Sequence, residues 1–298
     1  MDNFLLIFIT FTAGYLLKNI FAHNTSLILN QFILYISLPA MMLLQIPRLS
    51  FSFDVFIPII IAWLVMAISA IIIFYLSKFF SFSREVTGAL LLVGVLGNTS
   101  FIGIPITQAY YGDSSLAYVL MYDQLGSFIA LSTYGTFISV YYSNGEDVNI
   151  KAIAKKILTF PTFIALIISV AFIGTTFNPI VTSVLESLAM TIVPLALVSV
   201  GLQLNFKLPK EELKPMLSAL GVKIILAPLI AIGIVYIFSW EGFIANIAIM
   251  EASMGPMITA GAVASMAGLA PRLSSAIVGY GTIIAFLTTW IVYKILAM

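Results

Sequence analysis

Residues 84–111 read REVTGALLLVGVLGNTSFIGIPITQAYY, an apolar stretch that is interrupted near its middle. Gly97 weakens a helix, and the polar side chains of residues 98–100 compete for the hydrogen bonds of the backbone. Pro105 has no N–H group and crowds the carbonyl group four residues before it. The sequence therefore predicts a helix that unwinds between about residues 94 and 105.

The whole chain is too apolar for a water-soluble domain. Of its 298 residues, 61% are apolar and 8% are charged, with a mean hydropathy of +1.13, whereas soluble domains carry about 25% charged residues. The net charge of +1 gives no basic field for a nucleic acid. Without cysteine there are no disulfides or thiolate metal sites, and the single His23 cannot form a zinc site alone. The composition predicts an all-α, multi-pass membrane protein.

Ten hydrophobic segments are long enough to cross a bilayer, and they lack the alternation of barrel strands. With the N-terminus outside, ten basic residues fall at inside positions and only Arg48 and Lys294 fall outside. This bias follows the positive-inside rule and predicts a cell-membrane protein with both termini outside. Lys223 falls within the eighth segment. The segments are 3–21, 26–46, 54–77, 84–111, 115–142, 152–173, 178–203, 213–238, 242–269 and 272–297.

A polar break at 143–151 divides the ten segments into two sets of five, 1–142 and 152–298. An odd number of spans in each half requires the halves to have opposite orientations, as in the inverted repeats of many secondary transporters. Prolines recur at matching places: Pro39 and Pro194 lie in the second span of each half. Pro105 and Pro256 lie in the fourth span of each half. We therefore expect two inverted five-helix repeats, with a scaffold domain and a transport domain each built from both repeats.

The ninth segment repeats the interruption of the fourth. Pro256 frees the carbonyl group of Ala252, and Glu251, Ser253 and Thr259 add polar side chains. Unwound backbone within a membrane persists only where it faces protein or water, so the two breaks are expected to meet near the midplane. Helix N-termini there would favour an anion, and freed carbonyl groups would favour a cation. The alternative is a pair of proline kinks with a packing role alone.

The segment 97–105, GNTSFIGIP, followed by Tyr111-Gly112, resembles the fourth-span signature of the auxin efflux carrier family. Residues 29–39 resemble its second span, and residues 194–197 with Gly201 resemble its seventh. The resemblance covers nearly the whole chain. The short central loop is typical of bacterial or archaeal members rather than plant members.

The resemblance implies a carrier of organic anions that works by an elevator-like movement of a transport domain containing two broken, crossing helices. It implies that Asn98 and a crossover of Pro105 with Pro256 contact the substrate carboxylate, and that Gln124 reaches the substrate. The family often has paired prolines and an asparagine at the ninth-span crossover, where this chain has Gly255-Pro256 and Thr259, so the carboxylate is left open. Residues 251–254 also resemble cation ligands of the bile acid sodium symporters.

Ionisable groups deep in a span are candidates for function. Glu251 is the strongest, since it adjoins a break and could bind sodium or accept a proton; the alternative is a neutral side chain that donates to a freed carbonyl group. Asp123 in the fifth span is a second candidate for ion coupling, and its alternative is a structural ion pair with Lys223. Glu186 is expected near an outer end without a role in function.

The candidate substrate-binding residues are Asn98, Thr99, Ser100, Gly103, Pro105, Gln124, Gly255, Pro256 and Thr259, and the candidate ion-coupling residues are Glu251, Asp123 and Ser253. The expected partners are a small organic anion and the lipid bilayer, without nucleic acid, and a homodimer is a candidate assembly. No cofactor is expected apart from Na⁺ or H⁺ as coupling ion. The alternatives are a cation-coupled symporter and an ion channel. An intramembrane enzyme is disfavoured, because an aspartyl protease needs two aspartates in one membrane site and a serine enzyme needs a base beside its nucleophile, and the sequence offers neither.

Overall fold

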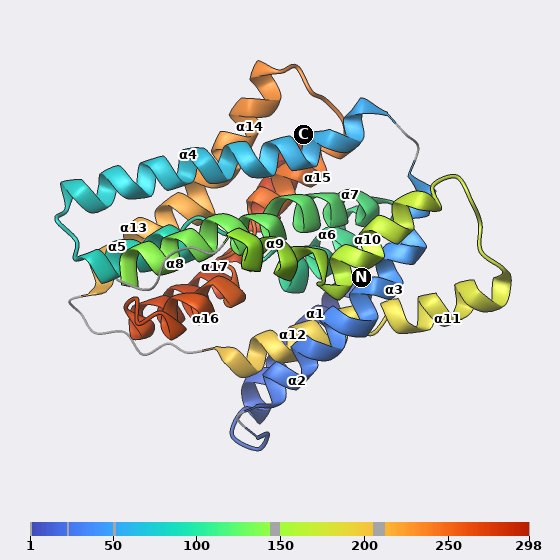
Figure 1. Cartoon of the computed structure of the whole chain (residues 1–298), viewed down its shortest axis with the longest axis horizontal. Helices are drawn as coiled ribbons and strands as arrows, with labels where there is room; N and C mark the ends of the chain where they lie inside the picture. The colour runs from blue at the N-terminus through green and yellow to red at the C-terminus, as the bar shows by residue number, and fades with distance from the viewer. Residues whose placement is uncertain (1, 23, 50–51, 144–149, 205–211, 298) are drawn as a thin grey trace.

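The computed structural model describes residues 2–22, 24–49, 52–143, 150–204 and 212–297, and these residues form helices joined by short connections (Figure 1). Each of the ten predicted hydrophobic segments contains helix. The helices are α1 Asp2–Leu17, α2 Thr25–Phe32, α3 Leu38–Gln45, α4 Ile57–Phe79, α5 Arg84–Val93, α6 Ile104–Tyr111, α7 Leu116–Met121, α8 Thr136–Ser143, α9 Ile150–Leu158, α10 Pro161–Ala171, α11 Pro179–Ala189, α12 Ile192–Gln203, α13 Leu213–Leu220, α14 Ala227–Ile237, α15 Phe243–Ala252, α16 Ile258–Met266 and α17 Pro271–Leu296.

Several of these helices are continued by π-helical turns, which join α2 to α3, α7 to α8 and α13 to α14, and which precede α6. Within the described residues, five helical stretches are long and apolar enough to cross a membrane: Thr25–Arg48, Phe53–Phe79, Pro179–Gln203, Leu213–Ile237 and Pro271–Leu296. Their flanks carry exposed apolar side chains such as Phe79, Ile180 and Tyr236. Such surfaces are stable next to lipid, so the predicted multi-pass membrane class is confirmed at this level. His23 and residues 144–149 of the predicted central loop lie outside the described residues.

One group of helices packs around α1 and α12, which lie side by side with α2 in Figure 1. Gly14 and Gly201 bring the two backbones together: a Cβ atom at Gly14 would lie 2.3 Å from the Val198 carbonyl oxygen. A Cβ atom at Gly201 would lie 2.4 Å from the Phe11 carbonyl oxygen. Small residues allow such close approach where no hydrophobic effect drives helices together. In the same group α3 packs against α10 and α11, and the hydroxyl groups of Ser37 and Thr191 are 2.7 Å apart.

The second group contains the interrupted helices. Here α4 packs against α14 and α15, and α5 packs against α8, α16 and α17. In Figure 1, α4 lies on the opposite side of the molecule from α1, α2 and α12. The interrupted pairs α5–α6 and α15–α16 are therefore enclosed by helices that shield their open backbone from lipid, which meets the requirement stated above for a broken helix in a membrane.

Candidate functional site

The two interrupted helices cross at their breaks. Helix α5 ends at Val93 and α15 ends at Ala252, and the chain is irregular over residues 94–98 and 253–257. The two irregular strands of chain form an antiparallel bridge between Gly97 and Pro256. The Asn98 N–H group donates to the Gly255 carbonyl oxygen at 2.8 Å, and the Met257 N–H group donates to that of Leu96 at 2.9 Å. Each break thus gives one backbone donor and one backbone acceptor of the other a hydrogen-bond partner.

Local sequence explains where the breaks fall. Asn98 caps the turn that follows it, since its Oδ1 accepts a hydrogen bond from the Phe101 N–H group at 3.3 Å. Pro105 is not at the crossing; it lies near the start of α6, directly after the π-helical turn Thr99–Gly103. The residue paired with Pro256 is Gly97, which differs from the Pro105–Pro256 crossover that the family resemblance implies. Pro256 packs against Gly281 of α17, where an added Cβ would lie 2.4 Å from Pro256 Cδ.

Buried polar groups converge on the crossing. Asn98 is 2% exposed, and its Nδ2 group has no hydrogen-bond partner in the described part of the chain. Glu251 is fully buried; its Oε1 accepts a hydrogen bond from Thr107 at 2.6 Å, while Oε2 has no partner among the described residues. Gly103 makes room for this carboxyl group, because a Cβ there would lie 2.3 Å from Oε2. The crossing therefore offers one unused amide donor and one unused carboxyl oxygen.

A lysine completes the crossing. Lys223 is 2% exposed, and its Nζ donates to the Ala252 carbonyl oxygen at 3.2 Å. This is the carbonyl group that Pro256 was predicted to free. Two helix C-termini, of α5 and α15, and two N-terminal ends, at Thr99 and Ile258, meet within the same crossing. Such an arrangement presents partial charges of both signs to a solute.

Comparison with known proteins places the chain in a family. Residues 1–293 match the family described as membrane transport proteins. The chain belongs to this family of membrane transporters. It is the family whose fourth-span motif residues 97–105 resemble, so the predicted membership is confirmed. The family is one of transporters rather than enzymes.

Two archaeal relatives resemble the transporter over most of its length. An uncharacterized transporter of Methanocaldococcus jannaschii is 30% identical over 266 residues, which are 85% of each chain. An uncharacterized transporter of Methanothermobacter thermautotrophicus is 24% identical over 292 residues, which are 96% of this chain and 95% of the relative. Because the second alignment spans 96% of this chain, it includes both interrupted helices.

In the transporter, Asp123 holds the turn after the first break. Its Oδ1 accepts hydrogen bonds from Thr99 and Ser100, both at 2.5 Å, and its Oδ2 accepts one from the Gln124 amide at 2.6 Å. Gln124 in turn accepts a hydrogen bond from Thr162 at 2.9 Å. Both candidates from the fifth predicted segment lie in the π-helical turn Tyr122–Phe128 and are engaged with neighbouring side chains. Within the described ranges Asp123 forms no ion pair with Lys223, so that structural alternative is wrong.

Of the other predicted site residues, Ser253 and Gly255 lie in the second break, whereas Thr259 and Pro105 lie outside the two irregular stretches. Ser253 is buried and donates to the Met250 carbonyl oxygen at 2.6 Å, so its hydroxyl hydrogen is used within its own helix end. Gly255 contacts Gly281. Thr259, in the first turn of α16, is exposed. Pro105 lines a polar cavity described next.

A cavity of about 390 Å³ lies between the two helix groups and reaches Pro105. Its polar lining comprises Gln45, Arg48, Gln108, Asp113 and Glu186. Arg48 and Glu186 approach to 4.0 Å and are both half-exposed. This cavity was not predicted, because its lining residues come from α1, α3, α6, α7, α11 and α12 and the turns beside them, and they share no motif. It extends from Pro105 to the ends of α3 and α11, and its lining does not include the residues of the crossing itself.

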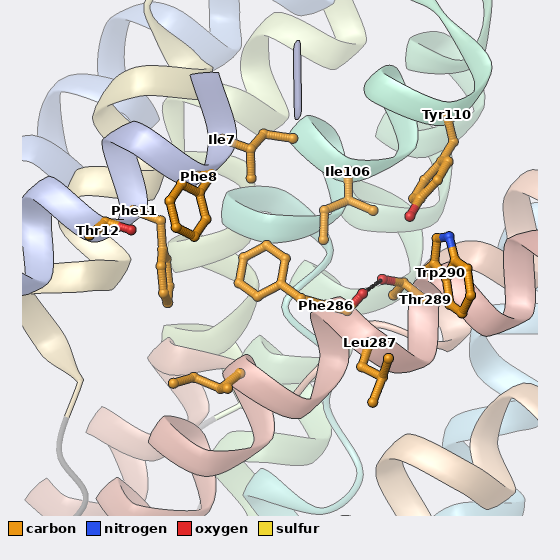
Figure 2. Close-up of a pocket in the computed structure, with 11 residues that line it drawn as sticks. Ile7, Phe8, Phe11, Thr12, Ile106, Tyr110, Phe286, Leu287, Thr289 and Trp290 are labelled. Atoms are coloured by element: carbon orange, nitrogen blue, oxygen red, sulfur yellow. Dashed lines mark hydrogen bonds between the residues drawn. The ribbon is translucent and has the colours of Figure 1, made fainter. Parts of the chain in front are cut away.

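A larger cavity of about 530 Å³ lies between α1, α6 and α17 and is almost wholly apolar. Figure 2 shows Phe8 and Phe11 of α1 bordering this hollow, with Phe286 of α17 and Tyr110 of α6 on other sides. The hydroxyl group of Thr289 donates to the backbone of its own helix. A carboxylate would find few free donors there, so the crossing remains the better candidate for an anion.

Proposed function

We propose that the transporter is a secondary or facilitative carrier of a small organic anion, bound by its carboxylate at the crossing. The observation that carries the proposal is the Asn98 Nδ2 group, which is buried at the crossing without an acceptor. An unsatisfied buried donor costs about 1–3 kcal/mol, and a carboxylate oxygen would satisfy it. The helix N-termini beside it favour negative charge.

An elevator-like movement accounts for the division into two helix groups. In this proposal the group around α1 and α12 is the scaffold, and the group holding the crossing moves against it. Ten spans in two inverted repeats, 1–142 and 152–298, would place the crossing near the midplane, with both termini outside the cell membrane. The polar cavity between the groups supports this proposal, since it gives a solute a path toward Pro105 from one side.

We predict that Asn98→Ala weakens carboxylate binding at least tenfold while leaving the protein folded. The purified transporter is titrated with acetate, benzoate, succinate and citrate, and binding is read as a rise in the thermal unfolding midpoint. Asn246→Ala is the matched control, because this residue lies on α15 away from the break. Equal binding by Asn98→Ala and the unchanged protein would place the anion elsewhere.

Coupling to a cation through Glu251 is a second candidate, favoured by its buried carboxyl group with one unpartnered oxygen. Glu251→Gln keeps an acceptor for Thr107 and removes the ionisable group. We expect carboxylate uptake into proteoliposomes to lose its response to a proton gradient in Glu251→Gln but not in Glu241→Gln, an exposed loop position. Replacing sodium by choline in parallel separates the two cations. Indifference of the unchanged protein to both gradients indicates a uniporter, and non-saturating conductance indicates a channel.

A further inference from the structure

Lys223 has no part in the function proposed above. It lies in the π-helical turn Gly221–Leu226, fully enclosed between membrane helices. An ammonium group in such a place is costly unless it has partners. The hydrogen bond to Ala252 is accompanied by close packing on Gly97, where an added Cβ would lie 2.9 Å from Nζ. No carboxylate of the described chain lies within ion-pair distance of Nζ.

The partner of Lys223 is a carbonyl group at the C-terminus of α15. Helix C-termini carry partial negative charge, and the freed carbonyl groups of broken membrane helices are the usual ligands of coupling cations. Here the ammonium group occupies such a position. A cavity of about 20 Å³, lined among others by Gly97, Thr99, Ser127 and Lys223, adjoins it. A space of this size holds about one water molecule, which can accept a further hydrogen bond from Nζ.

We propose that Lys223 is a tethered cation that charges the crossing, so that anion binding needs no dissolved metal cation at the Ala252 carbonyl group. The inference rests on the proposed function, which supplies the anion. Of the coupling schemes left open there, it excludes coupling to a sodium ion bound at the Ala252 carbonyl group. Nζ packs against Gly97, which directly precedes Asn98 in the unwound chain. For an anion on the order of 8 Å from Nζ and an effective dielectric constant of about 20, the attraction between the two charges strengthens anion binding about 30-fold.

The first test needs no anion. The thermal unfolding midpoint of the unchanged protein is measured in sodium chloride and in choline chloride, and we expect the same value in both. Lys223→Ala leaves a space beside the Ala252 carbonyl group, and methylammonium is expected to raise its midpoint in a saturable manner. Lys214→Ala is the matched control, because the Lys214 ammonium group lies over the Phe80 ring, 3.9 Å from its centre, at the exposed end of α13. A saturable rise with sodium in the unchanged protein overturns the proposal.

The second test measures anion affinity. We expect the tightest-binding of the four carboxylates named above to bind equally in sodium and choline, and to bind about 30-fold more weakly to Lys223→Met. Unweakened binding by Lys223→Met contradicts the proposal. If no carboxylate binds in either salt, the proposed function fails, while the anion-free comparison of sodium with choline still decides the role of Lys223. That comparison uses the unchanged protein, so it stands even if the lysine variants do not fold.

Discussion

Gly281→Ala is expected to destabilise the transporter by about 1–3 kcal/mol and to abolish carboxylate uptake. The added Cβ would lie 2.4 Å from Pro256 Cδ and 2.8 Å from a methyl carbon of Leu220. Proline cannot rotate away, because its ring is closed onto the backbone. The crossing would have to move off α17, and the bridge between Gly97 and Pro256 would be displaced.

The sign of this prediction runs against helix propensity, which favours alanine over glycine by about 1 kcal/mol. Gly233→Ala in α14 is the matched control, since a Cβ there has no heavy atom within 4 Å. We expect Gly233→Ala to be neutral or slightly stabilising. Thermal unfolding and proteoliposome uptake are measured for both variants. If both glycines tolerate alanine equally, the close packing of Pro256 on α17 does not hold the crossing.

Asp123→Ala is expected to be the second severe substitution. It leaves the hydroxyl groups of Thr99 and Ser100 and the amide group of Gln124 without their acceptor in a buried place. Because each such loss costs about 1–3 kcal/mol, we expect destabilisation on the order of 3 kcal/mol or more, together with loss of transport as the turn after the break loosens.

Asp123→Asn is expected to be intermediate. Its one remaining oxygen can still accept from both hydroxyl groups, but its amide group would face the Gln124 donor. Asp113→Ala is the control: Asp113 accepts from Gln108 at 2.8 Å in an exposed turn, where loss of the bond should matter little. The thermal unfolding midpoints of the unchanged protein and the three variants are measured to rank their stabilities. Normal stability of Asp123→Ala would show that this cluster does not hold the unwound segment in place.

Features of the breaks that depend on residues close together in the sequence could be predicted. The absent N–H group of Pro256 fixes which carbonyl group is freed, and the Ala252 oxygen is indeed bound by a side chain rather than by its own helix. For Pro105 the same reasoning extended the predicted break too far, since the irregular chain ends at Asn98. The capping side chain of Asn98 starts a new helical turn at Thr99, so the break ends before Pro105, which follows the π-helical turn Thr99–Gly103 within the continuing helix.

Contacts between distant segments were beyond the sequence. Lys223 and Asp123 were both recognised as costly groups within spans, and pairing them was reasonable on charge alone. Lys223 is instead bound to a carbonyl group, and Asp123 to two hydroxyl groups and one amide group. The polar cavity at Arg48 likewise forms only when six helices assemble, and no local sequence pattern predicts it.

The binding of a carboxylate at the crossing is tested most directly by locating one. Crystals of the transporter soaked with bromoacetate would reveal the bromine by anomalous scattering and the carboxylate beside it. The account predicts a carboxylate oxygen within hydrogen-bond distance, about 2.7–3.2 Å, of Asn98 Nδ2. A bromoacetate bound only beside Arg48 or within the apolar cavity of Figure 2, with the Asn98 amide left unoccupied, would contradict it.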